Sequence, residues 1–386
     1  MRNAVVVAAQ RTPVGKIRKA LAGFDAADLG AMAAIKCIEK AGIDPAIIDE
    51  CLMGNLFNVN HGCIARKVAL TAGLPFEVPG VAIERQCSSS LNAVAYGAML
   101  IQTGNIDVAL AGGVESYSQM PLMIKNPQMA YPSNLEFVKY DTHPPHLSIS
   151  MIQTAENLAK KYHLTREECD EFALRSHQNA ARAWKEGLFD EQVFPVEIPQ
   201  KKGAPIIFNM DECVRADATM ESLAKVRPVL EGGIVTAGNA SPMNDGAAMV
   251  LLMSEEKAKE LGLEPLAKVT GFASAGVDPS IMGFGPVPAS QKLLKKAGLT
   301  VDDIDLWEIN EAFAAQSIPC VRELNIPIER VNVNGGAISI GHPNAASGGI
   351  LVARMVYEMR RRDAKRGIVT FCCGGGQGFS VLFERD

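Results

Sequence analysis

The pattern of apolar and polar positions predicts strands that alternate with helices along this chain. The apolar run from Ala4 to Ala9 predicts a buried strand. A helical spacing follows further on, carried by Leu91, Val94, Ala95, Ala98 and Ile101, and Gly104-Asn105 ends that segment. Strands and helices in alternation are typical of an α/β fold.

The same elements occur twice. Lys40-Ala41-Gly42-Ile43 recurs 256 residues later as Lys296-Ala297-Gly298-Leu299, and Ile48-Asp49 recurs at the same offset as Ile304-Asp305. Each copy follows a segment with helical spacing (29–39 and 288–295) and precedes a short apolar strand (51–53 and 306–309). We therefore expect two related α/β halves.

The repeat relates two strand-to-helix junctions. Its offset places Cys87 opposite Pro343, the residue after His342. We expect a strand at 331–334, a loop from 335 to 343 and a helix at 347–360. The same comparison pairs a strand at 108–113 with one at 368–375, and both end in glycines, which let backbone approach a ligand closely. Cys87 and His342 are therefore expected at equivalent places in the two halves.

A segment of different character, about 116–233, lies between the halves and is rich in Pro, Met, Lys and Asn. It contains two long amphipathic patterns, at 150–161 and 166–186, and a strand-like pattern resumes at 234–239. We interpret the segment as an insertion in the first half. Insertions of this kind on an α/β core commonly cover the active site.

Composition narrows the class of protein. The chain has 386 residues, of which 48% are hydrophobic, so two or more domains are expected. Basic and acidic residues number 38 and 43, which leaves no electrostatic footprint for nucleic-acid binding, and Arg360-Arg361-Arg362 reads as the solvated end of a helix. No apolar run reaches membrane length, and the first strand leaves no room for a leader.

The nine cysteines form no Cys-x-x-Cys pair, which favours neither a zinc site nor a disulfide framework. We therefore expect no metal, a reducing compartment and a cytoplasmic protein.

Cys87 is the first candidate for chemistry. At a predicted helix N-terminus, free N–H groups and the helix dipole favour thiolate, which predicts a lowered thiol pKa. The alternative is a buried structural cysteine. A thiolate nucleophile also needs a base and donors for an oxyanion, and His342 is the best candidate base. Cys372 is either a second acid or base or a buried small residue, and Asn310 is either an oxyanion donor or a helix N-cap.

Seven ordered motifs resemble those of the thiolases, which exchange acyl groups between coenzyme A (CoA) thioesters, and they cover essentially the whole chain. They are Ala9-Gln10-Arg11-Thr12-Pro13, Gln86-Cys87-Ser88-Ser89, Ala111-Gly112-Gly113-Val114-Glu115, Thr236-Ala237-Gly238-Asn239-Ala240-Ser241, Asn310-Glu311-Ala312-Phe313-Ala314, Asn334-Gly335-Gly336-Ala337-Ile338 with Gly341-His342-Pro343, and Cys372 with the glycines that follow it.

The resemblance implies an α/β fold of duplicated, five-layer αβαβα architecture with an inserted loop domain. It implies an N-terminal half at 1–265, which includes the loop domain at about 116–233, and a C-terminal half at 266–386. It also implies a homodimer or homotetramer, with an accessory subunit as a further option. The expected small-molecule partners are acyl-CoA and CoA, the latter as co-substrate, with no bound cofactor.

The resemblance also implies a role for each motif residue. Cys87 would carry the acyl group, His342 would deprotonate it, and Cys372 would move the proton at the α-carbon of the acetyl group. One oxyanion hole would combine His342 with a water held by Asn310, and the other would use the backbone N–H groups of Cys87 and Gly374. The implied CoA contacts are Arg215, Ser222 and Ser241, and the implied acyl-pocket residues are Met151, Met282, Ala312 and Phe313.

Several positions depart from the family. Thiolases that make or split acetoacetyl-CoA often carry His-Met-Gly where this chain has Ser150-Met151-Ile152, and Pro242 and Asn344-Ala345-Ala346 are also unusual. We therefore expect a degradative enzyme for a non-standard 3-oxoacyl-CoA that is branched, aromatic or dicarboxylic, with an ordinary fatty-acid intermediate as the other option. The alternatives are a biosynthetic acetoacetyl-CoA thiolase, a decarboxylating ketosynthase, which normally uses two histidines, and a non-catalytic CoA-ester-binding subunit.

Overall fold

Each half of the chain builds a group of strands in the same spatial order. The computed structural model describes residues 2–127, 135–138 and 140–386. The first group runs β4 (Gly80–Ile83), β3 (Glu50–Gly54), β5 (Val108–Ser116), β8 (Asn244–Ser254) and β1 (Ala4–Arg11). The second runs β10 (Leu306–Ile309), β11 (Arg366–Cys373), β12 (Gln377–Glu384) and β9 (Ala267–Gly276). Val331 forms a single parallel bridge to Trp307 at the place that β4 occupies in the first group.

Pairing directions also match between the groups. β3 and β5 are parallel, as are β10 and β11, and the next two pairs in each group are antiparallel. A short pairing of β1 with β9 joins the groups, and β2 (Gly15–Lys16) pairs with β8. The predicted internal repeat is therefore confirmed by the strand order.

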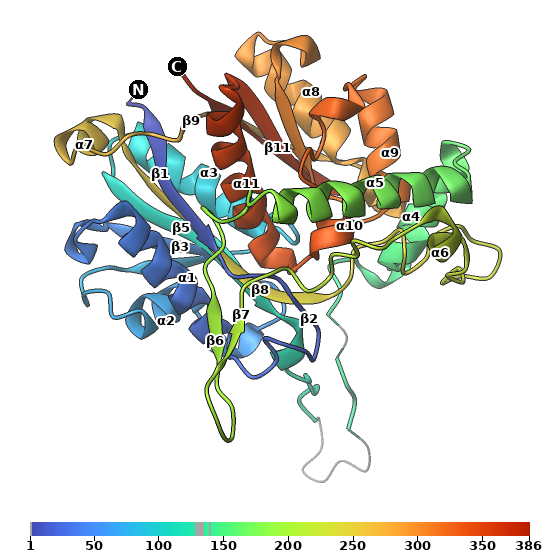
Figure 1. The fold of residues 1–386 in the computed structure, drawn as a ribbon, viewed down its shortest axis with the longest axis horizontal. Helices are drawn as coiled ribbons and strands as arrows, with labels where there is room; N and C mark the ends of the chain where they lie inside the picture. The colour runs from blue at the N-terminus through green and yellow to red at the C-terminus, as the bar shows by residue number, and fades with distance from the viewer. Residues whose placement is uncertain (1, 128–134, 139) are drawn as a thin grey trace.

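Helices cover and separate the two groups of strands (Figure 1). α1 (Ala26–Ala41) and α2 (Ile64–Thr71) pack on the outer face of the first group, and α8 (Pro286–Ala297) and α9 (Ala314–Glu323) on that of the second. α3 (Ser89–Gln102) and α11 (Ser347–Arg362) lie between them in one shared core. The result is the expected α/β architecture of five layers, αβαβα.

Successive side chains of each strand point alternately into two different cores, because the sheet is buried on both faces. In β5, Val108 and Leu110 pack with α1 and α2, whereas Ala109 and Ala111 face α3 and α11. The central helices meet at their first turns, where the Gly349 N–H donates to Ser90 Oγ at 2.9 Å. Because Cys87 and His342 each precede one of these helices, the fold brings the two junctions together.

Two predicted strands and one predicted loop are wrong. Residues 331–334 form only isolated bridges, because the Asn332 side chain pairs with both backbone groups of Ile309, at 2.9 Å each, and takes the place of a ladder. Residues 234–239 form a turn in which the Thr236 N–H donates to Asn239 Oδ1 at 2.8 Å. The expected loop at 335–343 contains a short helix, α10 (Ala337–Ile340).

The inserted segment packs mainly on the second half. Its helices α4 (Met151–Lys161) and α5 (Arg166–Lys185) begin at the caps Ser150 and Thr165 and agree with the predicted ranges. Figure 1 shows α5 running across α10 and α9. The segment also holds the hairpin of β6 (Val196–Ile198) and β7 (Ile206–Phe208), α6 (Met220–Ala224) and residues 128–134 and 139, which lie outside the described residues.

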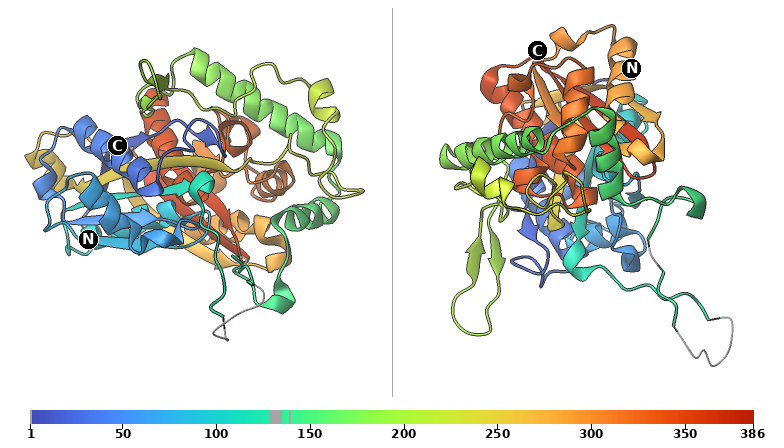
Figure 2. Two further views of the ribbon diagram at one scale, coloured as in Figure 1. Left: turned by 90° about the horizontal axis from the view of Figure 1, so that it is seen from below. Right: turned by 90° about the vertical axis from the view of Figure 1, so that its right-hand side faces the viewer.

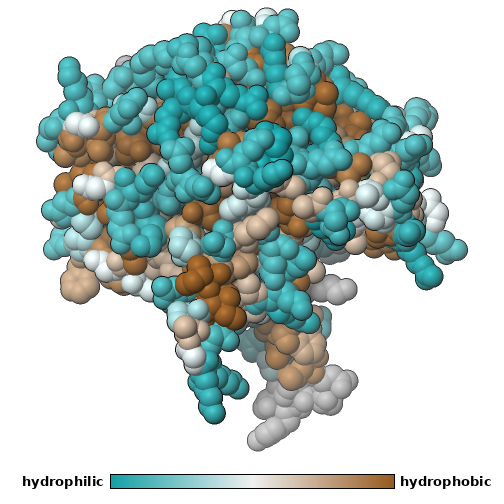
Figure 3. Space-filling model, viewed as in Figure 1, coloured by the Kyte–Doolittle hydropathy of each residue, from teal (hydrophilic) through white to brown (hydrophobic). Residues whose placement is uncertain are grey.

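Two parts of the segment project from the body, the β6–β7 hairpin and the described chain around 120–145 (Figure 2). Figure 3 shows a hydrophobic patch on the hairpin, where Ile206 and Ile207 are exposed. The remaining helix, α7 (Glu255–Glu260), follows β8. Among the described helices, none has the length and apolar character needed to cross a membrane.

Candidate active site

Cys87 lies in a tight turn between β4 and α3. Gln86 has φ +50°, and Ser89 Oγ fixes the turn by accepting from the Arg85 N–H (2.9 Å) and donating to the Gln86 carbonyl (2.6 Å). A Cβ at Gly374 would lie 2.8 Å from Gln86 Oε1, so the Gln86 side chain packs directly on the Gly374 backbone. The turn therefore holds Cys87 in place immediately before the helix.

The Cys87 thiol opens on a cavity of about 400 Å³ that Gly374 and Met151 also line. Asn344 Nδ2 lies 3.6 Å from Cys87 Sγ, and the Tyr117 hydroxyl donates to Asn344 Oδ1 at 3.2 Å. Burial raises the pKa of Cys87 to about 12, nearby Cys373 adds to the rise, and the N–H groups of Gly374 and Cys87 oppose it. The predicted lowering of this pKa is wrong, because the desolvation of the charged form outweighs the helix N-terminus.

His342 is held as a neutral imidazole. Its backbone N–H donates to Asn244 Oδ1 at 2.9 Å, and its ring Nδ1 lies 2.6 Å from Ser347 Oγ. The Ser347 hydroxyl donates to the Pro343 carbonyl (3.0 Å), and in the tautomer that satisfies both contacts Nδ1 donates to Ser347 Oγ. Nε2 therefore keeps its lone pair, and burial lowers the pKa of His342 to about 4.

Asn310 stands beside the base. Its Nδ2 lies 3.4 Å from His342 Nε2, and its N–H donates to the Thr370 carbonyl at 3.0 Å. The N-cap of α9 is Phe313, so the interpretation of Asn310 as a helix cap is wrong. Asn310 Oδ1 is buried and accepts no hydrogen bond from the described residues, which leaves it available to a polar hydrogen of water or substrate.

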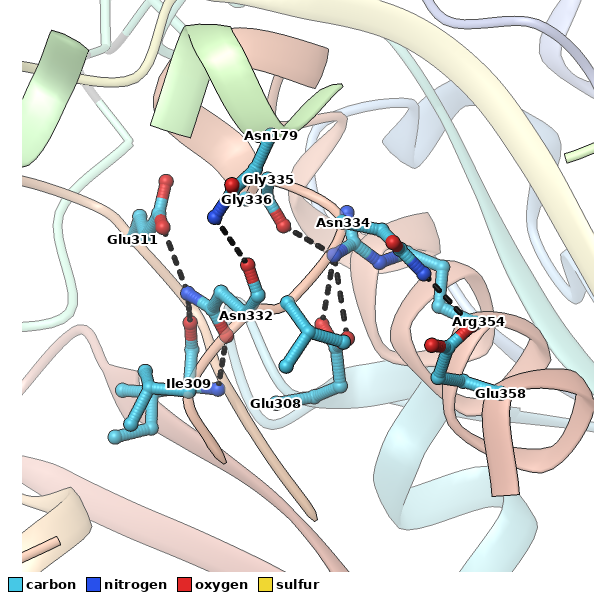
Figure 4. Close-up of polar contacts among 12 residues, drawn as sticks. Asn179, Glu308, Ile309, Glu311, Asn332, Asn334, Gly335, Gly336, Arg354 and Glu358 are labelled. Atoms are coloured by element: carbon cyan, nitrogen blue, oxygen red, sulfur yellow. Dashed lines mark hydrogen bonds and ion pairs between the residues drawn. The ribbon is translucent and has the colours of Figure 1, made fainter. Parts of the chain in front are cut away.

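A buried polar network supports Asn310 and the segment that leads to His342 (Figure 4). Glu311 accepts from Asn332 Nδ2 and from Ser176 Oγ, both at 2.7 Å. One residue before Ile309, Glu308 lies 3.1 Å from Arg354 Nη2, and its burial raises its pKa to about 7 against the opposing effect of Arg354. Sequence reasoning missed these supports, although a glutamate inside an apolar strand was a visible signal.

A further buried carboxylate connects two segments beside the Cys87 cavity. Glu115, at the end of β5, accepts from the N–H groups of Phe57 (2.9 Å) and Ala345 (3.2 Å). A Cβ at Gly113 would lie 2.2 Å from the Ala345 carbonyl oxygen. Gly113 therefore allows a close approach of two backbone segments, whereas the predicted approach of a ligand to these glycines stays a prediction.

Cys372 and Cys373 end β11 and face opposite layers. Burial raises the pKa of Cys372 well above its ordinary value, and Cys87 makes a smaller contribution to the rise. Cys373 Sγ instead donates to Ser88 Oγ at 3.0 Å. The contact of Cys373 with Ser88 brings the end of β11 against the turn that carries Cys87.

Comparisons with known proteins decide the family. A model of the thiolase N-terminal domain matches residues 4–256, and a model of the thiolase C-terminal domain matches residues 263–385. The chain belongs to the thiolase family. It is therefore an acyltransferase that uses CoA as a substrate.

Relatives span the full length of this thiolase. An acetyl-CoA acetyltransferase of Pseudomonas aeruginosa is 46% identical and a probable acetyl-CoA acyltransferase of Staphylococcus aureus is 43% identical, each with 100% of both chains covered. The crystal structure of the Bacillus anthracis acetyl-CoA acetyltransferase is similar at a TM-score of 0.94 with 42% identity, covering 100% of this chain and 99% of that one. Human mitochondrial 3-ketoacyl-CoA thiolase in complex with CoA is similar at 0.94 with 40% identity, covering 100% and 98%.

The residues expected in the acyl pocket of this thiolase gather in one apolar cluster. Met282, Ala312 and Phe313 are buried together with Cys372, and Met151 packs against them while it lines the Cys87 cavity. Ser241 adjoins the cluster, with its hydroxyl donating to the Ala312 carbonyl at 3.0 Å.

The residues expected to contact CoA are more dispersed. Arg215 lines a separate cavity of about 240 Å³ together with Lys16 and Lys19, and none of the three forms an ion pair with another described residue. Ser222 lines neither cavity. It is exposed on α6, where its hydroxyl donates to the Thr219 carbonyl (2.8 Å) and accepts from the Thr219 N–H (3.0 Å).

Proposed function

We propose that this thiolase cleaves a 3-oxoacyl-CoA longer than acetoacetyl-CoA, with CoA as the acyl acceptor, in degradation of the β-oxidation type. The observation that carries the proposal is the cavity shared by Cys87, Gly374 and Met151, which adjoins the apolar cluster around Met282 and Cys372. Ser150 and Ile152 stand where acetoacetyl-CoA thiolases often carry histidine and glycine, which supports a larger acyl group.

In the proposed first step, His342 Nε2 takes the Cys87 proton and the thiolate attacks the C3 carbonyl. The N–H groups of Cys87 and Gly374 stabilise the resulting oxyanion. The C2–C3 bond then breaks, and its electron pair stays on the acetyl-CoA fragment as an enolate, facing His342 and Asn310. Cys372 supplies the proton at C2, which releases acetyl-CoA and leaves the shortened acyl group on Cys87.

In the second step CoA gives its thiol proton to Cys372, and its sulfur attacks the acyl-Cys87 carbonyl. The C–S bond to Cys87 breaks, and the Cys87 thiolate recovers its proton from His342. The reverse sequence is a Claisen condensation. Because burial leaves both thiols and His342 neutral at rest, each proton transfer is expected to occur only with substrate bound.

We propose that the cavity of Lys16, Lys19 and Arg215 receives the CoA phosphates, since three cations without an ion pair to another described residue attract an anion.

We further propose that the chain divides into two halves at 1–265 and 266–386, with a loop domain at about 116–233, and that it assembles as a homodimer or homotetramer. The sedimentation-equilibrium mass measures the assembly, and a monomer would contradict that part.

The test is turnover with CoA and a panel of acetoacetyl-CoA and longer straight, branched, aromatic and dicarboxylic 3-oxoacyl-CoA esters. We expect acetyl-CoA and a shortened acyl-CoA in equal amounts, with the highest kcat/KM for an ester longer than acetoacetyl-CoA. The names of the relatives favour the biosynthetic alternative, which the highest kcat/KM on acetoacetyl-CoA would support. No turnover of any ester would favour a non-catalytic subunit.

A further inference from the structure

One wall of the Cys87 cavity carries a histidine that the proposed mechanism does not use. His143 lies in the inserted segment before α4, and its side chain is only 3% exposed. Its Nδ1 lies 2.8 Å from Asp141 Oδ1, which also accepts the His143 N–H at 2.9 Å. Ser148 Oγ donates to the second oxygen of Asp141. Asp141 thus holds the His143 imidazole at the cavity, and Ser148 holds Asp141.

The contacts determine what the imidazole offers. Hydrogen bonds from Ser148 and from His143 lower the pKa of Asp141 to about 2, so it is a carboxylate at neutral pH. Nδ1 therefore carries a proton that it donates to Asp141, and Nε2 is the ring nitrogen left for a ligand. Nε2 is buried and has no hydrogen-bond partner among the described residues. A hydroxyl is complementary to a buried ring nitrogen of this kind, because it can both donate and accept a hydrogen bond.

The other walls restrict the ligand further. Phe57 packs on Tyr117 and Tyr140, with ring centroids 4.9 and 5.2 Å apart. No Lys or Arg lines the described part of the cavity, and Asp141 contributes a negative charge. A carboxylate on the acyl chain would therefore be repelled, and a plain alkyl chain would leave Nε2 unpaired. A neutral hydroxyl meets both conditions.

We propose that His143, positioned by Asp141, forms a hydrogen bond with a hydroxyl on the acyl chain, so that hydroxylated 3-oxoacyl-CoA esters are the preferred substrate class. The proposal rests on the proposed cleavage of 3-oxoacyl-CoA. It replaces the dicarboxylic option of the sequence analysis and accounts for polar groups in a cavity where an alkyl chain needs none.

The test uses three CoA esters of one chain length: 3-oxohexanoyl-CoA, its 6-hydroxy derivative and 3-oxoadipyl-CoA. They differ only at C6, which is a methyl, a hydroxymethyl or a carboxylate group, and are named below by that group as the methyl, hydroxy and carboxylate esters. The same measurement is repeated with the corresponding eight-carbon esters. We expect wild-type kcat/KM to be about tenfold higher for a hydroxy ester than for the methyl ester of the same length, and lowest for the carboxylate, since one well-placed hydrogen bond changes such ratios by about this factor.

Variants then assign the preference to His143. His143→Leu is expected to lower kcat/KM for the hydroxy ester at least fivefold more than for the methyl ester, and His143→Gln, which keeps an acceptor, to retain part of the preference. Asp141→Asn is expected to weaken it through KM rather than kcat. The matched control is His146→Leu, because His146 is exposed three residues further along the same segment, and it should behave as wild type.

Three outcomes overturn the proposal: a wild-type preference for the methyl or carboxylate ester at both lengths, an equal loss on all esters in His143→Leu, and an unchanged preference in that variant. Failure of wild type to cleave any ester is distinct, because it would overturn the proposed function itself and this inference with it.

Discussion

The two halves of the molecule place their key residues at the same position of the fold and hold them by different means. In the first half the chain passes from β4 to α3 in a few residues, and serine hydroxyls fix the turn at Cys87. In the second half a longer segment connects the bridge at Val331 to α11. It contains α10 and carries His342.

The difference follows from what each residue must do. A nucleophile needs one fixed position, which a tight turn before a helix supplies. In the proposed mechanism His342 acts on a residue of the other half, and the longer segment that carries it has internal support from Glu311, Asn332 and Arg354. The duplication thus supplies the framework, and divergence of the second junction supplies the proton acceptor.

Removal of the thiol from the first junction is expected to have the largest effect. Cys87→Ala should lower kcat/KM by more than about 10⁴-fold, because no other described thiol lines its cavity. Steady-state turnover with the best ester of the panel measures it, and Cys63→Ala, a change at an exposed cysteine, is the control. A kcat/KM of Cys87→Ala within tenfold of wild type would show that Cys87 is not the nucleophile.

The corresponding change in the second junction is expected to be smaller. His342→Asn should lower kcat by about 10³-fold, since a general base typically contributes 10²–10⁴-fold. Rapid-quench measurement of acyl-enzyme formation locates the loss in the first step. His146→Asn, at an exposed histidine, should have no effect. An undiminished acylation rate in His342→Asn would assign the base elsewhere.

Asn310 tests the support beside the base. Asn310→Ala should lower kcat by about 10²-fold with a small change in KM, because an oxyanion donor acts on the transition state more than on the bound substrate. A rise in KM at constant kcat would show that Asn310 binds the ground state instead.

Acid should destabilise the second junction. Burial lowers the pKa of His342 to about 4, so between pH 6.5 and 4 the unfolded chain binds a proton that the folded protein does not. Stability therefore falls as the pH falls, by about 3 kcal/mol from this residue between pH 7 and pH 4. Urea unfolding at both pH values should show a smaller loss in His342→Asn than in wild type, and equal losses would contradict the buried neutral imidazole.

The smallest effect is expected at the side-chain contact between the junctions. Asn344→Leu removes the amide beside Cys87 Sγ and the acceptor of the Tyr117 hydroxyl. The loss of a donor to the thiolate should slow alkylation of Cys87 by iodoacetamide about three- to tenfold. Tyr117→Phe should give a smaller change in the same direction, and faster alkylation in Asn344→Leu would reverse the assigned role.

Much of the fold was predictable from the sequence, because repeats and apolar spacing are local signals. The repeated Lys40 and Lys296 segments predicted two halves, and α4, α5 and α11 begin within one residue of their predicted starts. The spacing predicted a strand at 331–334 and could not show that the side chain of Asn332 takes the place of the strand partner there.

The sequence predicts the residues of the site, which stay a prediction, and it does not predict their electrostatics. Motifs point to Cys87, His342, Cys372 and Asn310, whereas the pKa of Cys87 depends on burial by segments distant in the sequence. The network of Glu311 and Arg354 is equally a product of tertiary packing. His143 was missed because its segment has no periodic pattern, although the short spacing from Asp141 was a readable signal.

Mass spectrometry of the protein quenched during turnover tests the central claim that the first junction carries the acyl group and the second activates it. We predict that the shortened acyl mass appears on the peptide containing Cys87 in wild type, and that it forms about 10³-fold more slowly in His342→Asn. Acyl mass on a different residue, or formation at the wild-type rate in His342→Asn, would contradict the account.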